Sequence, residues 1–381
     1  MRVLAALVLI VTSPGGAEPA RAPSVDLGRM KVADSGVTAP TRSGTTARLT
    51  IDPALQRTAA ILLARAAPVD GAIVAADART GRILVWADRP RPGSQPGSTI
   101  TQRQAPAASL FKIVTTTALL ERAHVHPKRR VCWSGGEHGI WRRHLTPPQR
   151  GKIQCGPFGL ALGHSYNAVY AQLATSELMY SDLVETTQRF GFNHAVPFDQ
   201  DVMMGKIEIP YDDLGFARTA AGFENSTLSP LGALTLAYDV AARGQAIRLH
   251  IVEQAGTYSA PPKREHVRWV MSEHASANLR WMMEVTVHSG TSLEAFSDES
   301  GQSYLGRVRV AGKTGTLQES PRDPTTTWFV GFAPSHDPQI VVSVLIENGK
   351  VWRRKANEVA RDVLRAYFAS KGTPGVSDPL R

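Results

Sequence analysis

Apolar and polar positions follow two different periods along the chain, and these periods predict its helices and strands. In two stretches, one that starts at Pro53 and one at 351–368, the apolar side chains recur at helical spacing, which is typical of a helix with one buried face. Asp52 and Pro53 open the first stretch as an N-cap and a first-turn proline, two signals of a helix start. The predicted helices are one that starts at Pro53, then residues 109–121, 230–242, 278–288 and 351–368.

Five shorter runs, two early and three late, have the composition of strands. The early pair, 71–77 and 82–87, is joined by Ala78-Arg79-Thr80-Gly81, which predicts a hairpin. The late runs are 307–316, 326–332 and 339–347. Successive strands joined by short turns must pair antiparallel. The pattern therefore predicts an α/β (α+β) fold in which helices flank a central antiparallel sheet, with an inserted, mainly helical subdomain at about 123–210.

The first residues have the pattern of an export signal. Arg2 precedes an apolar stretch from Val3 to Val11, and small residues at Gly15-Gly16-Ala17 follow. We expect a signal peptide at 1–22 and a polar, Pro/Gly-rich linker at 23–47, before a main domain at 48–370 and a tail at 371–381. The protein is thus predicted to be exported to the periplasm or extracytoplasmic cell envelope. No membrane span is expected beyond the N-terminal segment, because no run of 18 apolar residues occurs.

The formal net charge of +10 does not by itself indicate nucleic acid as a partner. The basic residues are scattered along the 381 residues, apart from Lys128-Arg129-Arg130 and Arg142-Arg143, and no nucleic-acid motif accompanies them. We therefore predict no nucleic-acid partner. In an exported protein, such a charge favours attraction to an anionic wall polymer or membrane surface.

The chain has two cysteines, Cys132 and Cys155, which lie 23 positions apart. In an oxidising compartment they are expected to form a disulfide, which would stabilise the fold by about 3 kcal/mol in the chain-entropy description. A zinc site is the alternative, because several histidines lie nearby, namely His124, His126, His138 and His144. Without a C-x-x-C pair that signal is weak. The sequence therefore predicts the disulfide and no metal site.

Ser109-Leu110-Phe111-Lys112 stands at the start of a predicted helix, with small or apolar residues on both sides. Residues three apart project from the same helix face, so Lys112 can reach the Ser109 hydroxyl. A serine becomes nucleophilic when a base takes its proton. Burial and a helix N-terminus both favour the neutral amine that such a base requires. On its own the pattern is more often a helix cap followed by a solvated lysine.

Two further polar motifs follow. Ser165-Tyr166-Asn167, 56 positions after Ser109, offers a hydroxyl for proton relay and an amide for a peptide carbonyl. A rival, Ser276-Ala277-Asn278, has the same spacing but leads straight into a predicted helix, so we interpret Ser276 as an N-cap. Lys313-Thr314-Gly315-Thr316 ends a predicted strand. Its cation and two hydroxyls suit a carboxylate, and Gly315 allows close approach of a bound peptide.

In this order the three motifs resemble the S-x-x-K, S-x-N and K-T-G motifs of penicillin-binding proteins and serine β-lactamases. The resemblance covers about residues 48–368. Other matching pieces are Leu49–Gln56, Leu228–Leu231, Gly290-Thr291 and Trp328–Phe332. They are more similar to the transpeptidase domain of penicillin-binding proteins than to a β-lactamase. The stretch 123–155, which contains both cysteines, has no counterpart in the family pattern.

The resemblance implies a catalytic cycle on D-Ala-D-Ala ends of peptidoglycan stem peptides. Ser109 is expected to attack the carbonyl between the two D-alanines, with Lys112 as base and Ser165 as the relay to the leaving amine. Penicillins and other β-lactams are expected to trap the acyl-enzyme. The resemblance implies no metal or organic cofactor. It implies peptidoglycan (cell-wall) synthesis as the process, and it leaves open the place of the protein in that process and any cell-wall synthesis partners.

The same resemblance assigns substrate binding. Asn167 is expected to hold the peptide, and Lys313, Thr314, Gly315 and Thr316 to receive its terminal carboxylate. Backbone N–H groups at Ser109 and Thr316 would form the oxyanion hole. The sequence leaves three alternatives to a D,D-transpeptidase: a D,D-carboxypeptidase, a class D-like β-lactamase and a β-lactam sensor without turnover.

Overall fold

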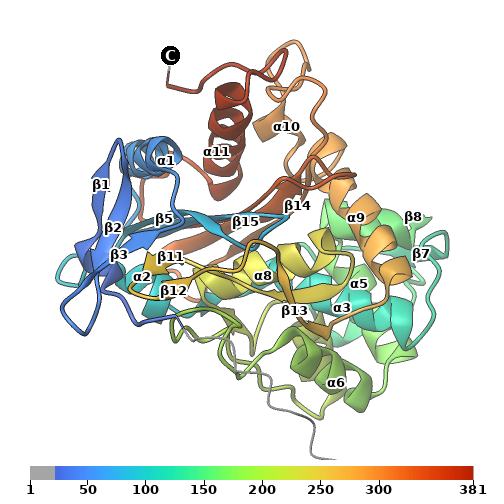
Figure 1. Cartoon of the computed structure of the whole chain (residues 1–381). Helices are drawn as coiled ribbons and strands as arrows, with labels where there is room; N and C mark the ends of the chain where they lie inside the picture. The colour runs from blue at the N-terminus through green and yellow to red at the C-terminus, as the bar shows by residue number, and fades with distance from the viewer. Residues whose placement is uncertain (1–21, 381) are drawn as a thin grey trace, which may run out of the picture.

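The computed structural model describes residues 22–380, so the predicted signal peptide lies outside the described residues except for Ala22. A five-stranded antiparallel sheet forms the centre, in the order β14-β15-β16-β4-β5 (Figure 1). Its strands are β4 (Asp70–Asp77), β5 (Ile83–Arg89), β14 (Ala311–Leu317), β15 (Thr325–Ala333) and β16 (Ile340–Asn348). Pairing of β16 with β4 joins the early and late parts of the chain. The predicted antiparallel sheet built from distant segments is confirmed.

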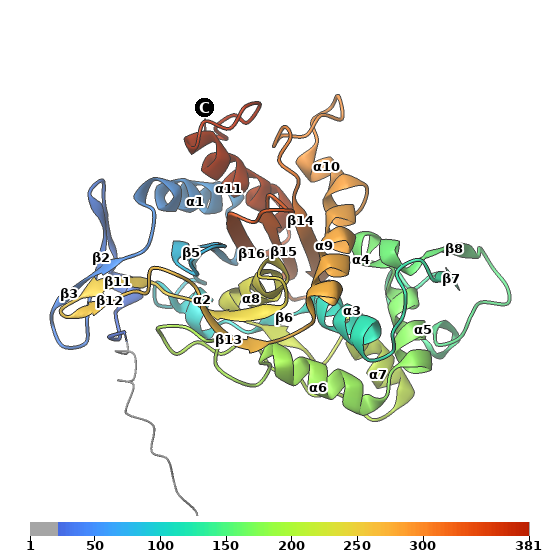
Figure 2. The ribbon, with the colours of Figure 1, turned by 45° about the vertical axis from the view of Figure 1, so that its right-hand side comes forward.

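Both faces of this sheet are covered. Helices α1 (Pro53–Ala66) and α11 (Ala356–Ser370) pack on one face, and α8 (Pro230–Ala241) packs on the other (Figures 1 and 2). Neighbouring residues of β16 consequently enter different cores, Val341 with the α8 side and Val342 with the α11 side. Every residue of α8 is buried, including the polar Thr235 and Asp239, and most of the helix is apolar on all sides.

The segment predicted to be a linker is folded. Three strands, β1 (Lys31–Ala33), β2 (Gly36–Pro40) and β3 (Thr46–Leu49), pair with β11 (Val252–Ala255) and β12 (Tyr258–Ser259) in a second sheet. Val37, Ala39 and Ala47 are buried there. The structure differs from the prediction because β3 pairs with β11, about 200 residues later in the chain. The local composition of residues 23–47 does not indicate a pairing with so distant a strand.

The helical part of the molecule lies beyond the β14 edge of the central sheet (Figure 2). Its helices are α3 (Lys112–Glu121), α4 (Ala161–His164), α5 (Asn167–Glu177), α6 (Tyr180–Phe190), α7 (Asp213–Ala220) and α9 (Glu273–His288). Within 123–210 the helices α4, α5 and α6 follow β7, β8 and long loops, and helices from outside that range, α3, α7 and α9, pack beside them. The remaining helices and strands are α2 (Ser98–Gln102), α10 (Leu293–Phe296), β6 (Ala105–Pro106), β7 (Arg130–Trp133), β8 (Gln154–Pro157), β9 (Thr227–Leu228), β10 (Gln245–Arg248), β13 (Glu265–Trp269) and 3-10 helices at Leu27–Arg29, Ala108–Phe111, Arg142–His144 and Phe158–Leu160.

Helix α9 begins earlier than the sequence suggested. Ser272 is its N-cap, and the Ser272 hydroxyl accepts a hydrogen bond from the Ala275 N–H. Ser276 lies inside the helix, buried, and its hydroxyl donates to the Val240 carbonyl at 2.9 Å. The interpretation of Ser276 as an N-cap is therefore wrong, because the chain offers a cap four residues before it.

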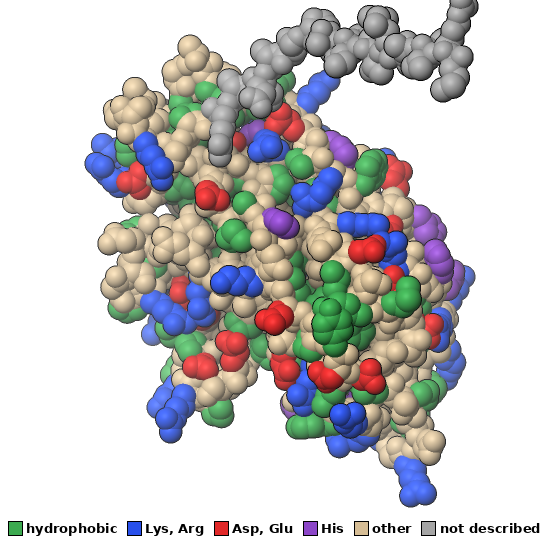
Figure 3. Space-filling model, turned by 90° about the horizontal axis from the view of Figure 1, so that it is seen from below, with side chains coloured by type: hydrophobic (Ala, Val, Ile, Leu, Met, Phe, Trp, Pro, Cys, Tyr) green, Lys and Arg blue, Asp and Glu red, His purple; other side chains and the backbone are tan. Residues whose placement is uncertain are grey.

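Charged side chains are interspersed on the surface. Figure 3 shows one face on which Lys and Arg alternate with Asp and Glu rather than gathering on one element. Within residues 22–380, no helix has both the length and the apolar character that a membrane span needs. The same part of the chain contains no group of three His, Cys, Asp or Glu side chains arranged to hold a metal ion.

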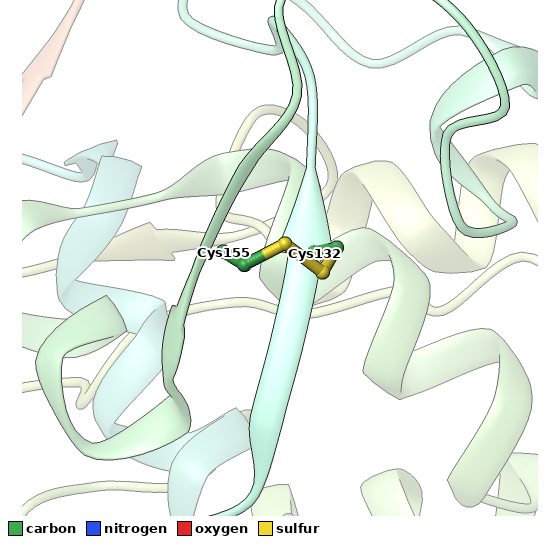
Figure 4. The surroundings of a disulfide bond; sticks show 2 residues. All are labelled: Cys132 and Cys155. Carbon is green, nitrogen blue, oxygen red and sulfur yellow. A yellow bond between two sulfur atoms is a disulfide. The ribbon is translucent and has the colours of Figure 1, made fainter.

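Cys132 and Cys155 face each other on β7 and β8 and are joined by a disulfide (Figure 4). The bond joins the two strands of a hairpin, and the loop between these strands contacts α5 through the Gly136 carbonyl and Asn167. We expect native protein from an oxidising compartment to show no titratable thiol before reduction and two after it. The double variant Cys132→Ser/Cys155→Ser is expected to lose about 3 kcal/mol of unfolding free energy in denaturant titrations. Two free thiols in the native, unreduced protein would contradict the bridge.

Candidate active site

Ser109 lies in the 3-10 helix Ala108–Phe111, which continues directly into α3. The turn before it is sharp, because Ala108 has a φ of +48°, a conformation that is uncommon for residues other than glycine. Gly222 makes this turn possible, since a Cβ at that position would lie 2.2 Å from the Ala108 carbonyl oxygen. The Ser109 side chain is consequently presented at the start of a buried helix.

Lys112 is fully buried, with 0% of its surface exposed. Its Nζ lies 2.7 Å from each of three oxygens, those of the Ser109 hydroxyl, the Asn167 side-chain amide and the Ala221 carbonyl. A neutral amine has two N–H donors and one lone pair. With its two donors on Asn167 and Ala221, the lone pair faces Ser109. The geometry therefore suits Lys112 to accept the Ser109 proton.

Burial also sets the charge state of this lysine. Desolvation lowers the pKa of Lys112 well below its ordinary value, and the positive charge of Lys313 lowers this pKa further. Both effects favour the neutral amine over the ammonium. The protonation state that a base requires is thus the one that the surroundings of Lys112 stabilise.

Ser165 connects the two lysines. It ends α4 in the left-handed conformation, with a φ of +58°. Its hydroxyl donates to Ser109 Oγ at 2.9 Å and accepts from Lys313 Nζ at 3.2 Å. An unbroken hydrogen-bonded path therefore runs from Lys112 through Ser109 and Ser165 to Lys313.

Asn167, the first residue of α5, uses its whole amide group within the protein. Its Oδ1 accepts from Lys112, while its Nδ2 donates to the backbone carbonyls of Gly136 at 2.9 Å and Glu137 at 3.3 Å. The structure thus places Asn167 beside Lys112. Its amide N–H groups contact the loop after β7, whereas the sequence suggested a peptide carbonyl as their partner.

The Lys-Thr-Gly-Thr segment lies on β14, the edge strand of the central sheet. Lys313 is fully buried, and burial lowers its pKa to about 7. The Thr314 hydroxyl is 2.6 Å from that of Thr291, and Thr316 is exposed. A Cβ on Gly315 would lie 3.2 Å from the Ala108 side chain, so only a small residue fits this close approach. The free edge of β14 offers backbone groups to an extended ligand.

The structure therefore brings together the predicted residues Ser109, Lys112, Ser165, Asn167 and Lys313, and it leaves Ser276 on a separate contact with α8. Sequence reasoning missed the contacts made by backbone carbonyls, namely those of Gly136, Glu137 and Ala221. Backbone groups carry no residue-type signal, so no motif pointed to them.

The depressed pKa of Lys313 predicts a pH-dependent stability. Above pH 7 the folded chain releases this proton, whereas the unfolded chain keeps it up to about pH 10.5. The free energy of unfolding is therefore expected to rise from pH 7 to pH 9, by about 1.4 kcal/mol per pH unit from this group. Denaturant titrations at pH 7, 8 and 9 measure the slope.

The variant Lys313→Met should have a shallower slope over the same window, and Lys263→Met, which removes an exposed lysine, should keep the wild-type slope. Equal slopes in wild type and Lys313→Met would show that Lys313 is charged throughout this range.

A family model described as penicillin binding protein transpeptidase domain matches residues 71–368. Among curated proteins, peptidoglycan D,D-transpeptidase PbpA from Mycolicibacterium smegmatis is 26% identical over 324 residues, which cover 74% of this chain and 62% of that protein. Stage V sporulation protein D from Bacillus subtilis is 26% identical over 255 residues, 64% of this chain and 38% of that protein. The chain thus spans less than two thirds of the length of these relatives.

Solved structures show the same fold. The crystal structure of PBPA from Mycobacterium tuberculosis aligns with a TM-score of 0.69 at 20% identity, covering 85% of this chain and 83% of that one. The D,D-transpeptidase domain of a peptidoglycan glycosyltransferase from Eggerthella lenta aligns with a TM-score of 0.68 at 22% identity, with the same coverage of both chains. Because the family model covers most of its length, the chain belongs to the penicillin binding protein transpeptidase family.

Proposed function

We propose that this protein is a serine D,D-transpeptidase that acts on D-Ala-D-Ala ends of peptidoglycan stem peptides. The observation that carries the proposal is the 2.7 Å contact between Nζ of the fully buried Lys112 and Oγ of the half-buried Ser109. The M. smegmatis relative bears the name peptidoglycan D,D-transpeptidase, and PBPA from M. tuberculosis has been solved as a penicillin G acyl-enzyme complex. Both names agree with the chemistry that the site permits.

Acylation begins at Ser109. As its Oγ bonds to the carbonyl carbon between the two D-alanines, its proton passes to the lone pair of Lys112. Backbone N–H groups at Ser109 and Thr316 receive the oxyanion, and one such donor typically contributes a factor of about 10²–10³ in rate. The tetrahedral intermediate then collapses with cleavage of the peptide bond.

The leaving amine needs a proton, and Ser165 is placed to supply it. Its hydroxyl touches Ser109 Oγ and is itself held by Lys313. A proton can pass from the Lys112 ammonium to the terminal D-alanine amine through this hydroxyl. D-Alanine departs, and the rest of the stem peptide remains as an ester on Ser109.

Substrate binding is assigned to the edge of β14. Lys313 and the hydroxyls of Thr314 and Thr316 would hold the terminal carboxylate, while Gly315 leaves room for the peptide backbone. A bound carboxylate near Lys313 would raise its pKa and favour the ammonium. Asn167 would hold the peptide through its amide, which requires its bonds to the Gly136 and Glu137 carbonyls to be exchanged for substrate.

Deacylation completes the cycle. An amine of a second stem peptide attacks the ester carbonyl and loses a proton to the neutral Lys112. The crosslinking amide forms as the ester bond breaks, and the proton returns to Ser109 Oγ. β-Lactams would acylate Ser109 in the same way and remain bound. We place this activity outside the cytoplasm, in a transpeptidase domain at 48–370 behind an N-terminal export signal, in association with other cell-wall synthesis proteins.

Labelling with a fluorescent penicillin, followed by the release rate of the label, tests this function. We expect stoichiometric labelling, release over hours, and crosslinked product from a stem pentapeptide only when an amine acceptor is present. Rapid release would instead identify a class D-like β-lactamase. D-Alanine release without transfer to the acceptor would identify a carboxypeptidase, and slow release without any peptide turnover would identify a sensor.

A further inference from the structure

A cavity separate from the active site lies at the turn end of the central sheet. It has a volume of about 540 Å³ and lies between the C-terminal end of α8, the first two turns of α9 and the turns that follow β4 and β15. Phe332 in its wall pairs with Ala311, whereas Thr316 pairs with Thr327, five residues further along the ladder. At about 3.3 Å per residue, the cavity is therefore about 17 Å from Thr316 along the strand.

Four arginines from four different segments line this cavity. Arg79 follows β4, Arg243 follows α8, Arg264 precedes β13 and Arg280 lies on α9. Arg79 pairs with Asp337 at 2.8 Å. Within residues 22–380, the guanidinium groups of the other three have no ion pair or hydrogen bond. Segments distant in sequence thus converge to place three uncompensated positive charges around one hollow.

The acidic residues of the lining do not balance this charge. They are Asp337, which is engaged by Arg79, and Glu273, which forms no ion pair with the other three arginines. The wall also contains Ser335, whose buried hydroxyl has no hydrogen-bond partner in the described part of the chain. A buried hydroxyl without a partner is costly, so a bound ligand that supplies a hydrogen-bond acceptor would relieve that cost.

The charge excess selects the ligand class. Guanidinium groups bind carboxylates and phosphates through paired N–H donors. A carboxylate has one negative charge and two acceptor oxygens, too few to engage three guanidinium groups. A phosphate monoester carries about 1.5–2 negative charges at neutral pH and three acceptor oxygens, so several arginines can share it. The volume also accommodates the polyol or sugar that carries the phosphate.

We propose that this cavity binds a phosphate ester, through Arg243, Arg264 and Arg280. The ester is a phosphate monoester, carried either by a soluble polyol or sugar or by the headgroup of an anionic lipid. Binding of this kind would hold the domain at an anionic surface while the Ser109 site, at a different place on the sheet, stays free for peptide.

Isothermal titration of the full chain with glycerol 3-phosphate at low salt tests the soluble source. Flotation with phosphatidylcholine vesicles containing phosphatidic acid, whose headgroup is a phosphate monoester, tests the lipid source. We expect the wild type to bind at least one probe, with at least tenfold weaker binding in Arg243→Ala/Arg280→Ala and at 0.5 M salt. Binding of glycerol 3-phosphate assigns the soluble source, and binding of vesicles alone assigns the lipid.

The matched control is Arg29→Ala/Arg65→Ala, which removes two exposed arginines distant from the cavity in the sequence and absent from its lining. It should bind like the wild type. Equal weakening in both double variants would mean that binding responds to net charge alone, and it would overturn the site. Failure of the wild type to bind both glycerol 3-phosphate and the vesicles would also overturn it. Labelling by fluorescent penicillin should be unchanged in all variants, which verifies their fold independently.

Discussion

Replacement of Ser109 by alanine is expected to abolish covalent labelling by penicillin while leaving the fold intact. The hydroxyl is the atom that bonds to the β-lactam carbonyl, and the other hydroxyl in contact with it, that of Ser165, faces Lys313 rather than the lone pair of Lys112. Alanine removes one half-buried oxygen and leaves no cavity of methyl size, so the melting temperature should change little. Intact-mass spectrometry after incubation with penicillin measures the adduct.

Ser276→Ala provides the matched control for this experiment. It also removes one serine hydroxyl, but from α9, where that hydroxyl binds the Val240 carbonyl. Full labelling of Ser276→Ala together with none in Ser109→Ala supports the nucleophile. An adduct that persists in Ser109→Ala would refute the proposed mechanism.

Replacement of Ser165 by alanine is expected to slow acylation by about 10²–10⁴-fold, the usual contribution of a positioned proton-transfer group. The change breaks the path between Ser109 and Lys313 while keeping Lys112 in contact with Ser109. Stopped-flow measurement of acylation by a chromogenic β-lactam gives the rate. The melting temperature should stay within a few degrees of wild type, because the hydroxyl is not part of the core.

Ser276→Ala should show the opposite profile in the same assays. It is expected to lose about 1 kcal/mol of unfolding free energy, since a buried hydrogen bond to the Val240 carbonyl disappears, and to acylate at the wild-type rate. If the two variants exchanged these phenotypes, Ser276 on α9 would be the residue that relays the proton. The assignment of Ser165 and Asn167 to the active site would then be wrong.

The order of the central strands was not predicted, because it depends on the pairing of β16 with the distant β4. The antiparallel pairing of consecutive strands was predictable, because a short turn leaves them little freedom. The hairpin of β4 and β5 and the β15–β16 pair are examples, since their strands are long, apolar and bounded by turn residues. The N-terminal sheet was not predictable. Its strands have two to five residues each, and its stability depends on β11, whose pairing with β3 is set by the tertiary fold.

The active site was predictable to the extent that its chemistry resides in side chains. Ser109 and Lys112 share a helix face, so their contact follows from spacing alone. Their approach to Ser165 and Lys313 rested on resemblance, because nothing in local sequence brings α4 and β14 together. The amide of Asn167 illustrates the limit, since its N–H partners are carbonyls in a stretch that has no counterpart in the family pattern.

The pairing of β4 with β16 also dictates when the protein becomes functional during its synthesis. Ribosomes deliver Val74 long before its partner Ser343, so an emerging chain exposes an apolar hairpin with one open edge. Lys313, which completes the hydrogen-bonded path to Ser109, also arrives late. An incomplete chain therefore lacks this assembled site and needs protection from aggregation until its last strands have been synthesised. The late position of β14 in the sequence thus makes assembly of the path between Ser109 and Lys313 one of the last events of folding.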